Sequence, residues 1–135
     1  MIGISDGDTI TILTSNKEQI KIRLAEIDAP ESNQPYGKRS KQLLSELVFN
    51  KNVLVKKETI DRYKRIVGRV YIGDVYVNAA MIEAGGAWVY RKYATDASLF
   101  ILEEKARKAK IGLWGLPEAQ QMPPWEWRRL KRIAQ

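Results

Sequence analysis

The sequence contains no cysteine and no histidine, and these two absences exclude most of the familiar catalytic groups. Without cysteine there are no disulfides, no zinc–thiolate sites and no thiol nucleophiles. Without histidine there is no Ser-His-Asp triad, and no imidazole serves as metal ligand or general base. An enzyme with this composition depends on carboxylates, arginine, lysine, tyrosine or a hard metal ion.

Long apolar stretches are also missing. No run of about 18 apolar residues is present, so the sequence predicts no membrane-spanning helix. The opening residues do not follow the basic, apolar and small-residue order of a signal peptide, and we expect that a leader has been removed. A chain without cysteine is stable in either redox compartment, so composition leaves the location open.

The composition that remains is that of a folded, basic protein. Its 135 residues include 44% apolar and 29% charged residues, which predicts a single domain over residues 1–135. Lys and Arg number 23 against 16 Asp and Glu, for a net charge of +7. This surplus favours nucleic acid as the partner, with an anionic membrane surface as the second choice.

Hydrophobic periodicity predicts short strands interleaved with helices. The expected strands cover residues 9–13, 20–24, 53–55, 66–72 and 87–90. The expected helices cover residues 38–49, a short segment capped by Asn78 and ended by Gly85 and Gly86, and residues 99–109 with Gly112 as the stop. Residues 115–135 form a basic, tryptophan-containing tail whose prolines suit a first helical turn. The pattern predicts a small barrel with appended helices.

Four acidic residues fall in two clusters at the ends of the first two expected strands. Asp6 and Asp8 lie in SDGDTI, before the first strand, while Asp28 and Glu31 lie in IDAPE, at the end of the strand that carries Arg23. Antiparallel pairing of these strands brings the four carboxylates together, and they repel one another unless a cation lies among them. Oxygen-only ligands favour Ca²⁺ or Mg²⁺. The alternative is a scatter of acids on surface turns.

Two arginines give this region the character of a phosphate site. Ile22 and Leu24 share one face of their strand, so Arg23 projects to the opposite face, near the acids. Arg65 lies in DRYKR and leads into the strand 66–72. A metal ion with guanidinium groups on either side suits a phosphodiester, because both stabilise the extra negative charge of the transition state. Each arginine has the alternative role of a surface partner for an acid.

Five segments resemble the staphylococcal nuclease (thermonuclease) family, in that family's order and at compatible spacing. They are DGDT (6–9), RLAEIDAPE (23–31), DRYKR (61–65), VNAAMIEAGGAWVY (77–90) and ARKAKIGLW (106–114). The resemblance implies an α+β fold: a five-stranded OB-fold β-barrel with about three packed α-helices. It also implies Ca²⁺-dependent cleavage of DNA and RNA to 3′-phosphate products.

The resemblance further implies a role for each matching acidic residue. Asp8 and Asp28 bind the ion directly, helped by the backbone carbonyl of Ala29, and Asp6 lies behind them. Glu31 orients or deprotonates the attacking water. Ala29 replaces the threonine of some family members, but the ion needs only the carbonyl, so this departure changes little.

The same resemblance implies the contacts to the substrate. Arg23 and Arg65 hold the phosphate, and the nucleic-acid contacts fall on Tyr63, Lys64, Trp88 and Tyr90. Lys64 replaces the family's DRYGR glycine, so the turn before Arg65 forms without glycine's free access to positive φ. Strand alternation leaves one of Trp88 and Tyr90 as a packing residue instead. The tryptophans at 125 and 127 are either a second nucleic-acid contact or a hydrophobic clamp for the tail.

The sequence therefore predicts a monomeric, sequence-tolerant nuclease that uses Ca²⁺, acts on DNA and RNA and has no membrane partner. Family members are often exported, which favours a secreted or periplasmic location. The rival interpretation is an OB-fold module that binds single strands without cutting them. The presence of all six acids and arginines favours the enzyme. A membrane-surface binder is a weaker third interpretation, because the basic residues form no single amphipathic stripe.

Overall fold

A mixed β-sheet with the strand order β1-β2-β3-β6-β5 forms the centre of this computed structural model, which describes residues 1–134. The strands of this sheet are β1 (Gly3–Asp6), β2 (Thr9–Leu13), β3 (Gln19–Leu24), β5 (Leu54–Ile60) and β6 (Ile66–Ile72). A short strand, β7 (Val75–Tyr76), pairs with β6 alone. Neighbours along the sheet run antiparallel, except for the parallel pair β3 and β6.

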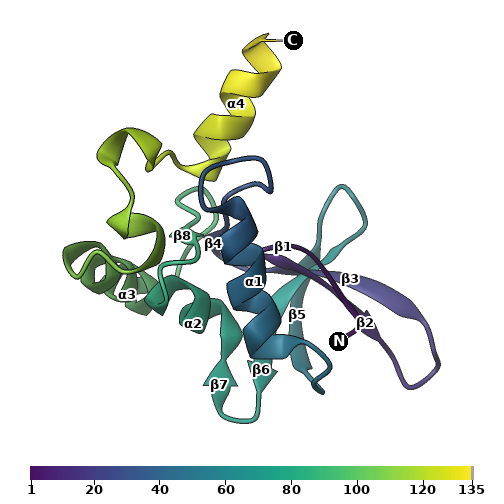
Figure 1. Cartoon of the computed structure of the whole chain (residues 1–135). Coiled ribbons are helices and arrows are strands. Elements are labelled where there is room, and N and C mark those ends of the chain that lie inside the picture. The colour runs from purple at the N-terminus through teal and green to yellow at the C-terminus, as the bar shows by residue number, and fades with distance from the viewer. Residues whose placement is uncertain (135) are drawn as a thin grey trace.

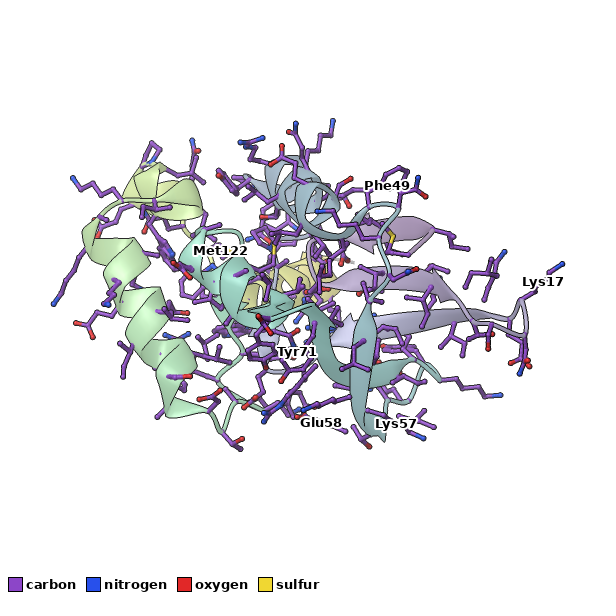
Figure 2. All side chains as sticks on the ribbon, turned by 90° about the horizontal axis from the view of Figure 1, so that it is seen from below. Lys17, Phe49, Lys57, Glu58, Tyr71 and Met122 are labelled. Atoms are coloured by element: carbon purple, nitrogen blue, oxygen red, sulfur yellow. The ribbon has the colours of Figure 1, made fainter. Side chains whose placement is uncertain are left out.

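The predicted hairpin formed by β2 and β3 is confirmed. Its register pairs Ile10 with Ile22 and Thr9 with Arg23. Ile10, Ile22 and Leu24 are fully buried, as the alternation of apolar and polar residues predicts. Figure 2 shows Lys17 at the outer tip of this hairpin, far from its base, where the chain enters at Asp8.

A second, two-stranded sheet corrects the expected position of Asp28. Asp28 does not end the strand that carries Arg23, because β3 stops at Leu24 and the chain then turns through Glu26 at φ 67°. It lies in β4 (Ile27–Asp28), which pairs antiparallel with β8 (Trp88–Val89). The turn was not expected because glutamate is an uncommon residue at positive φ.

The α+β fold is confirmed, while closure of the barrel is not seen in the backbone hydrogen bonds. Within residues 1–134, β1 and β5 are the two ends of the sheet path and do not pair with each other. The path has five strands, but β1 is one of them, and the strand expected at 87–90 lies in the second sheet as β8. The sheet curves around its core without a complete ring of ladder bonds.

Within residues 1–134, four α-helices accompany the sheet, where about three were expected. They are α1 (Gly37–Val48), α2 (Val77–Glu83), α3 (Ala97–Lys108) and α4 (Pro124–Ala134), with 3₁₀ turns η1 (Gly112–Gly115) and η2 (Glu118–Gln120) between α3 and α4. The first three helices pack on the core through Leu44, Met81 and Leu99, respectively. The additional helix is α4, which Figure 1 shows in yellow, standing away from the sheet. No helix within residues 1–134 combines the length and apolarity that crossing a bilayer needs.

Asn78 does not cap α2, as its sequence position suggested. It lies inside the helix and is fully buried. Its Oδ1 accepts a hydrogen bond from the Val70 N–H (3.1 Å), and its Nδ2 donates to the carbonyls of Ala25 (3.0 Å) and Gly68 (3.3 Å). Because Ala25 belongs to the turn between β3 and β4, Asn78 anchors that turn to the sheet. The helix expected over 99–109 is α3, which ends at Lys108, one residue early, while Gly112 opens η1 and does not itself end the helix.

Candidate active site

The candidate site begins where the base of the β2–β3 hairpin meets β4. Asp8, just before β2, is almost fully buried, and its backbone carbonyl accepts from the Leu24 N–H at 2.8 Å. Its carboxylate accepts from the Ala29 N–H (2.7 Å) and from the Thr9 hydroxyl (3.0 Å). Asp8 therefore ties the entrance of the hairpin to the exit of β4. This contact brings the two acidic clusters of the sequence together.

Arg23 lies between the carboxylates of Asp8 and Asp28. Its Nη2 is 3.5 Å from Asp8 Oδ2 and 3.4 Å from Asp28 Oδ1. Its Nη1 donates to the carbonyls of Leu24 and Ile27, both at 2.8 Å. One guanidinium thus holds the β3–β4 turn and neutralises two acids. The opposite-face placement predicted for Arg23 agrees with this position.

Burial and mutual repulsion shift the pKa values of the acids. Burial, with the neighbouring Asp8 carboxylate, raises the pKa of Asp6 to about 8. Burial also raises the pKa of Asp28 to about 6, although Arg128 and Arg23 oppose the shift. Burial works against the charge of Asp8 too, but Arg23 and three hydrogen bonds hold its pKa below the usual range. Asp8 is therefore the ionised acid of the group. Any added positive charge would stabilise the charged forms of Asp6 and Asp28.

Glu31 is positioned by the tight loop that joins β4 to α1. The Glu31 N–H donates to the side chain of Gln34 at 3.0 Å, and the Glu31 carbonyl accepts from the Gln34 N–H at 2.9 Å. Gly37, the first residue of α1, comes so close that a Cβ there would lie 1.7 Å from the Glu31 carbonyl oxygen. Only glycine permits this approach, and in this loop the Glu31 carboxylate lies 3.1 Å from Arg128, which also contacts Asp28.

Arg128 of α4 is a site residue that the sequence interpretation missed. Its Nη1 lies 3.1 Å from Asp28 Oδ1 and 3.1 Å from Glu31 Oε1, and its Nη2 lies 2.6 Å from Asp28 Oδ2. Burial by itself lowers the pKa of Arg128, but the carboxylates of Asp28 and Glu31 raise it above its usual value. The residue was counted within the basic tail. No local signal links it to acids about a hundred positions earlier in the chain.

Arg65 lies apart from this group. Its Nε pairs with the Asp61 carboxylate at 2.8 Å, and Asp61 also accepts from the backbone N–H groups of Tyr63 and Arg65. Among residues 1–134, no hydrogen bond or ion pair joins Arg65 to Asp8, Asp28 or Glu31. Lys64 adopts φ 63°, so the turn keeps the conformation that glycine would favour, at a cost of about 1 kcal/mol.

The aromatic residues expected to meet nucleic acid differ in exposure. Tyr63 is exposed on its loop. Trp88 is only 7% exposed and packs edge-on against Trp114 and Trp125, so it is the packing residue of the pair that alternation predicted. Tyr90 is half-buried and stacks flat against Trp125, with ring centroids 5.6 Å apart and planes 3° apart.

The donor chemistry of the site suits a hard cation, but the acids are not gathered around one point. Within residues 1–134, no three acidic side chains are arranged as a ready-made ion site. Arg23 separates Asp8 from Asp28, and Arg128 separates Asp28 from Glu31. Ca²⁺ prefers oxygen ligands, which carboxylates and backbone carbonyls supply here. The carboxylates of Asp8, Asp28 and Glu31 therefore fit the ion once the guanidinium that lies between them, from Arg23 or Arg128, has moved.

The raised pKa of Asp6 predicts a pH dependence of stability. Between about pH 4 and pH 8 the folded state holds a proton on Asp6 that the unfolded chain releases, so this residue makes the folded state less stable as pH rises. Asp6→Asn should reduce that loss when thermal unfolding is followed in chelator from pH 5 to pH 8. Asp74→Asn, at an exposed turn, is the control. A slope unchanged in Asp6→Asn would show that Asp6 ionises normally.

Comparison with known proteins identifies the family. A family model described as staphylococcal nuclease homologue matches residues 21–115, the range that holds Arg23, Asp28 and Glu31. The chain is 43% identical over 145 residues to a micrococcal nuclease of Shigella flexneri, covering 99% of this chain and 82% of that protein. An uncharacterized endonuclease of Escherichia coli is 46% identical over 132 residues, covering 97% and 84%. A staphylococcal-like nuclease of Arabidopsis thaliana is 40% identical over 115 residues, covering 85% of this chain but 35% of its own length. With its matching segments and α+β fold, this chain belongs to the staphylococcal nuclease homologue family.

Proposed function

We propose that this chain is a Ca²⁺-dependent nuclease that hydrolyses phosphodiester bonds in DNA and RNA with little sequence preference and leaves 3′-phosphate ends. The enzyme class agrees with the family and with the names of its relatives. The observation that carries the proposal is the position of Arg23 between two buried carboxylates, Asp8 and Asp28, with Glu31 beside them. Carboxylates for a hard ion, a forked donor and a carboxylate base are what phosphodiester hydrolysis requires without histidine.

The residues that would hold the ion are Asp8, Asp28 and the carbonyl of Ala29, with Asp6 supporting Asp8 through the Asp8 N–H, 3.3 Å from Asp6 Oδ1. When bound, the ion supplies positive charge that polarises the phosphoryl group. Glu31 accepts a proton from the attacking water while the water oxygen bonds to phosphorus. The bond from phosphorus to the 5′ oxygen breaks, and that oxygen takes up a proton. Arg23 donates two parallel hydrogen bonds to the phosphoryl oxygens as their charge grows.

Arg65 can hold the phosphate, as proposed, only if its loop moves toward the site. Its guanidinium pairs with Asp61 and lies over the exposed ring of Tyr63, with the guanidinium carbon 5.4 Å from the ring centroid. A substrate strand that reaches this loop meets Tyr63, Lys64 and Arg65 together. The net charge of +7 favours such a polyanionic partner over a neutral one. A monomeric, exported enzyme is the form that we propose for it.

Cleavage assays with the ion added and removed test the proposal directly. Plasmid, single-stranded DNA and RNA should all be cut in Ca²⁺, and cutting should stop in chelator. Mg²⁺ should replace Ca²⁺ poorly, because Mg²⁺ requires a tighter octahedron than these partly fixed acids offer. Full activity in chelator would contradict the metal mechanism. Tight binding of single strands without cleavage in any ion would favour the rival OB-fold binding module.

A further inference from the structure

The C-terminal strap, residues 121–134, crosses directly over the candidate site. Gln121 Nε2 donates to the carbonyls of Trp114 (3.1 Å) and Leu116 (2.7 Å), which fixes the start of the strap to η1. Gln34 Nε2 then donates to the Met122 carbonyl at 2.6 Å. Gln34 belongs to the loop that carries Glu31. The path of the strap is therefore set by the same loop that positions the proposed general base.

Arg128 uses the carboxylate oxygens that an ion needs. Its two Nη atoms contact both oxygens of Asp28 and, in addition, Glu31. The Asp28 side chain has no exposed surface in this arrangement. A cation that binds Asp28 must displace the guanidinium, because the two positive groups compete for the same oxygens and repel each other.

Trp125 covers a second part of the site. Its ring lies flat on Tyr90, the planes 3° apart, in the offset-stacked geometry that a nucleic-acid base would also adopt on that ring. Trp125 also meets Trp88 edge-on, with centroids 5.6 Å apart. The strap thus occupies an ion-ligand position and a stacking position at once, three residues apart on one face of α4.

The strap is held mainly through its first turns. Beyond Arg128, residues 129–133 are all exposed, and Figure 1 shows the end of α4 projecting away from the sheet. Trp127 adds one hydrogen bond, from its Nε1 to Asn33 Oδ1 at 3.3 Å. The Arg128 side chain itself keeps a third of its surface in contact with solvent. Release of α4 uncovers the buried Pro124 and the contact of Trp125 with the cluster around Trp88. Within residues 1–134 the main hydrophobic core contains no residue of the strap, so the docked state is separable from that core.

We propose that the C-terminal strap is autoinhibitory: Arg128 and Trp125 block the ion and stacking positions, and α4 must leave before Ca²⁺ and substrate bind. This inference rests on the proposed function, whose ion site it regulates. Ca²⁺ binding and strap docking exclude each other, so each weakens the other by the same factor. A charge-assisted pair such as Arg128 with Asp28 contributes about 1.5–3 kcal/mol, which corresponds to roughly a tenfold to hundredfold effect on ion affinity.

The test compares Arg128→Ala with Arg129→Ala in the 135-residue chain. Arg129 is the exposed neighbour whose partner, among residues 1–134, is Glu126 of the same helix, so its removal controls for lost charge. Calorimetry should show Ca²⁺ binding about tenfold or more tighter in Arg128→Ala and unchanged in Arg129→Ala. Amide hydrogen exchange of residues 124–133 should accelerate when Ca²⁺ is added to the unmodified protein. In Arg128→Ala it should be fast before any ion is added.

The outcomes separate this inference from the proposed function. If Arg128→Ala binds Ca²⁺ no tighter than the unmodified protein while both cleave in Ca²⁺, the strap inference is wrong and the nuclease proposal stands. If Arg128→Ala binds Ca²⁺ more weakly and cleaves more slowly, Arg128 assists the site instead of blocking it. If neither protein binds the ion or cuts nucleic acid, both proposals fail. Faster exchange in α4 together with tighter ion binding supports the inference.

Discussion

Glu31→Gln is expected to lower the turnover rate about 10²- to 10⁴-fold, the range that general-base assistance supplies. The amide keeps the shape of the carboxylate, and the bonds from the Glu31 backbone to Gln34 remain. Only the basic oxygen that accepts the proton from water is lost. Substrate affinity should stay the same or rise, because one negative charge beside the phosphate has been removed.

The measurement is single-turnover cleavage in Ca²⁺, with substrate binding measured in parallel. Glu46→Gln, on the exposed side of α1, is the matched control and should leave both quantities unchanged. Because Glu31 also pairs with Arg128, the same comparison is repeated in the Arg128→Ala background. The loss of rate should persist there. Cleavage at the normal rate in Glu31→Gln would place the base elsewhere.

Arg23→Lys is expected to lower the turnover rate about 10²- to 10³-fold, as the loss of a single preorganised donor does in other enzymes. Lysine keeps the charge but loses the planar fork. In this structure one edge of the fork serves the carbonyls of Leu24 and Ile27, while the other lies near Asp8 and Asp28. A single ammonium group cannot meet both sets of partners. The substitution should therefore also lower thermal stability.

Single-turnover rates and thermal unfolding separate these two effects. Arg39→Lys, an exposed arginine on α1, is the control and should change neither. If Arg23→Lys unfolds at a lower temperature but cleaves at the normal rate in conditions where it is folded, Arg23 is a structural residue of the β3–β4 turn alone. A rate loss that persists well below the unfolding temperature assigns it to the phosphate.

The sequence brought Asp8, Arg23 and the second acidic cluster to one place for a local reason. A two-stranded hairpin with one buried face has a single register, so the positions of its ends follow from alternation. The structure agrees for Asp8 and Arg23. It differs at Asp28, whose own short strand depends on a turn through Glu26 and on pairing with β8, about sixty residues later.

Strand alternation does not predict the contacts of residues outside the strands. The segment 61–65 was linked to the site through its resemblance to family members, but Arg65 pairs with Asp61 in this structure. Asn78 has the residue type of a helix cap, yet it is buried as a link between α2 and the sheet. The Asn78 partner Ala25 is 53 residues away, so only the folded chain supplies it, whereas Arg65 pairs locally with Asp61.

By itself, the sequence determined the class of chemistry. With no histidine or cysteine, with paired carboxylates and with a basic surplus, it left oxygen ligands, guanidinium donors and a polyanionic substrate. Only the tertiary structure decided what contacts those carboxylates. The sequence predicts a solvated basic face for the tail and leaves Trp125 as either a nucleic-acid contact or a hydrophobic clamp. In the structure Trp125 packs on Tyr90 and Arg128 contacts Asp28, and both contacts join residues far apart in the chain. Such contacts depend on how α4 is directed after η1 and η2, and no local pattern of residues encodes that direction.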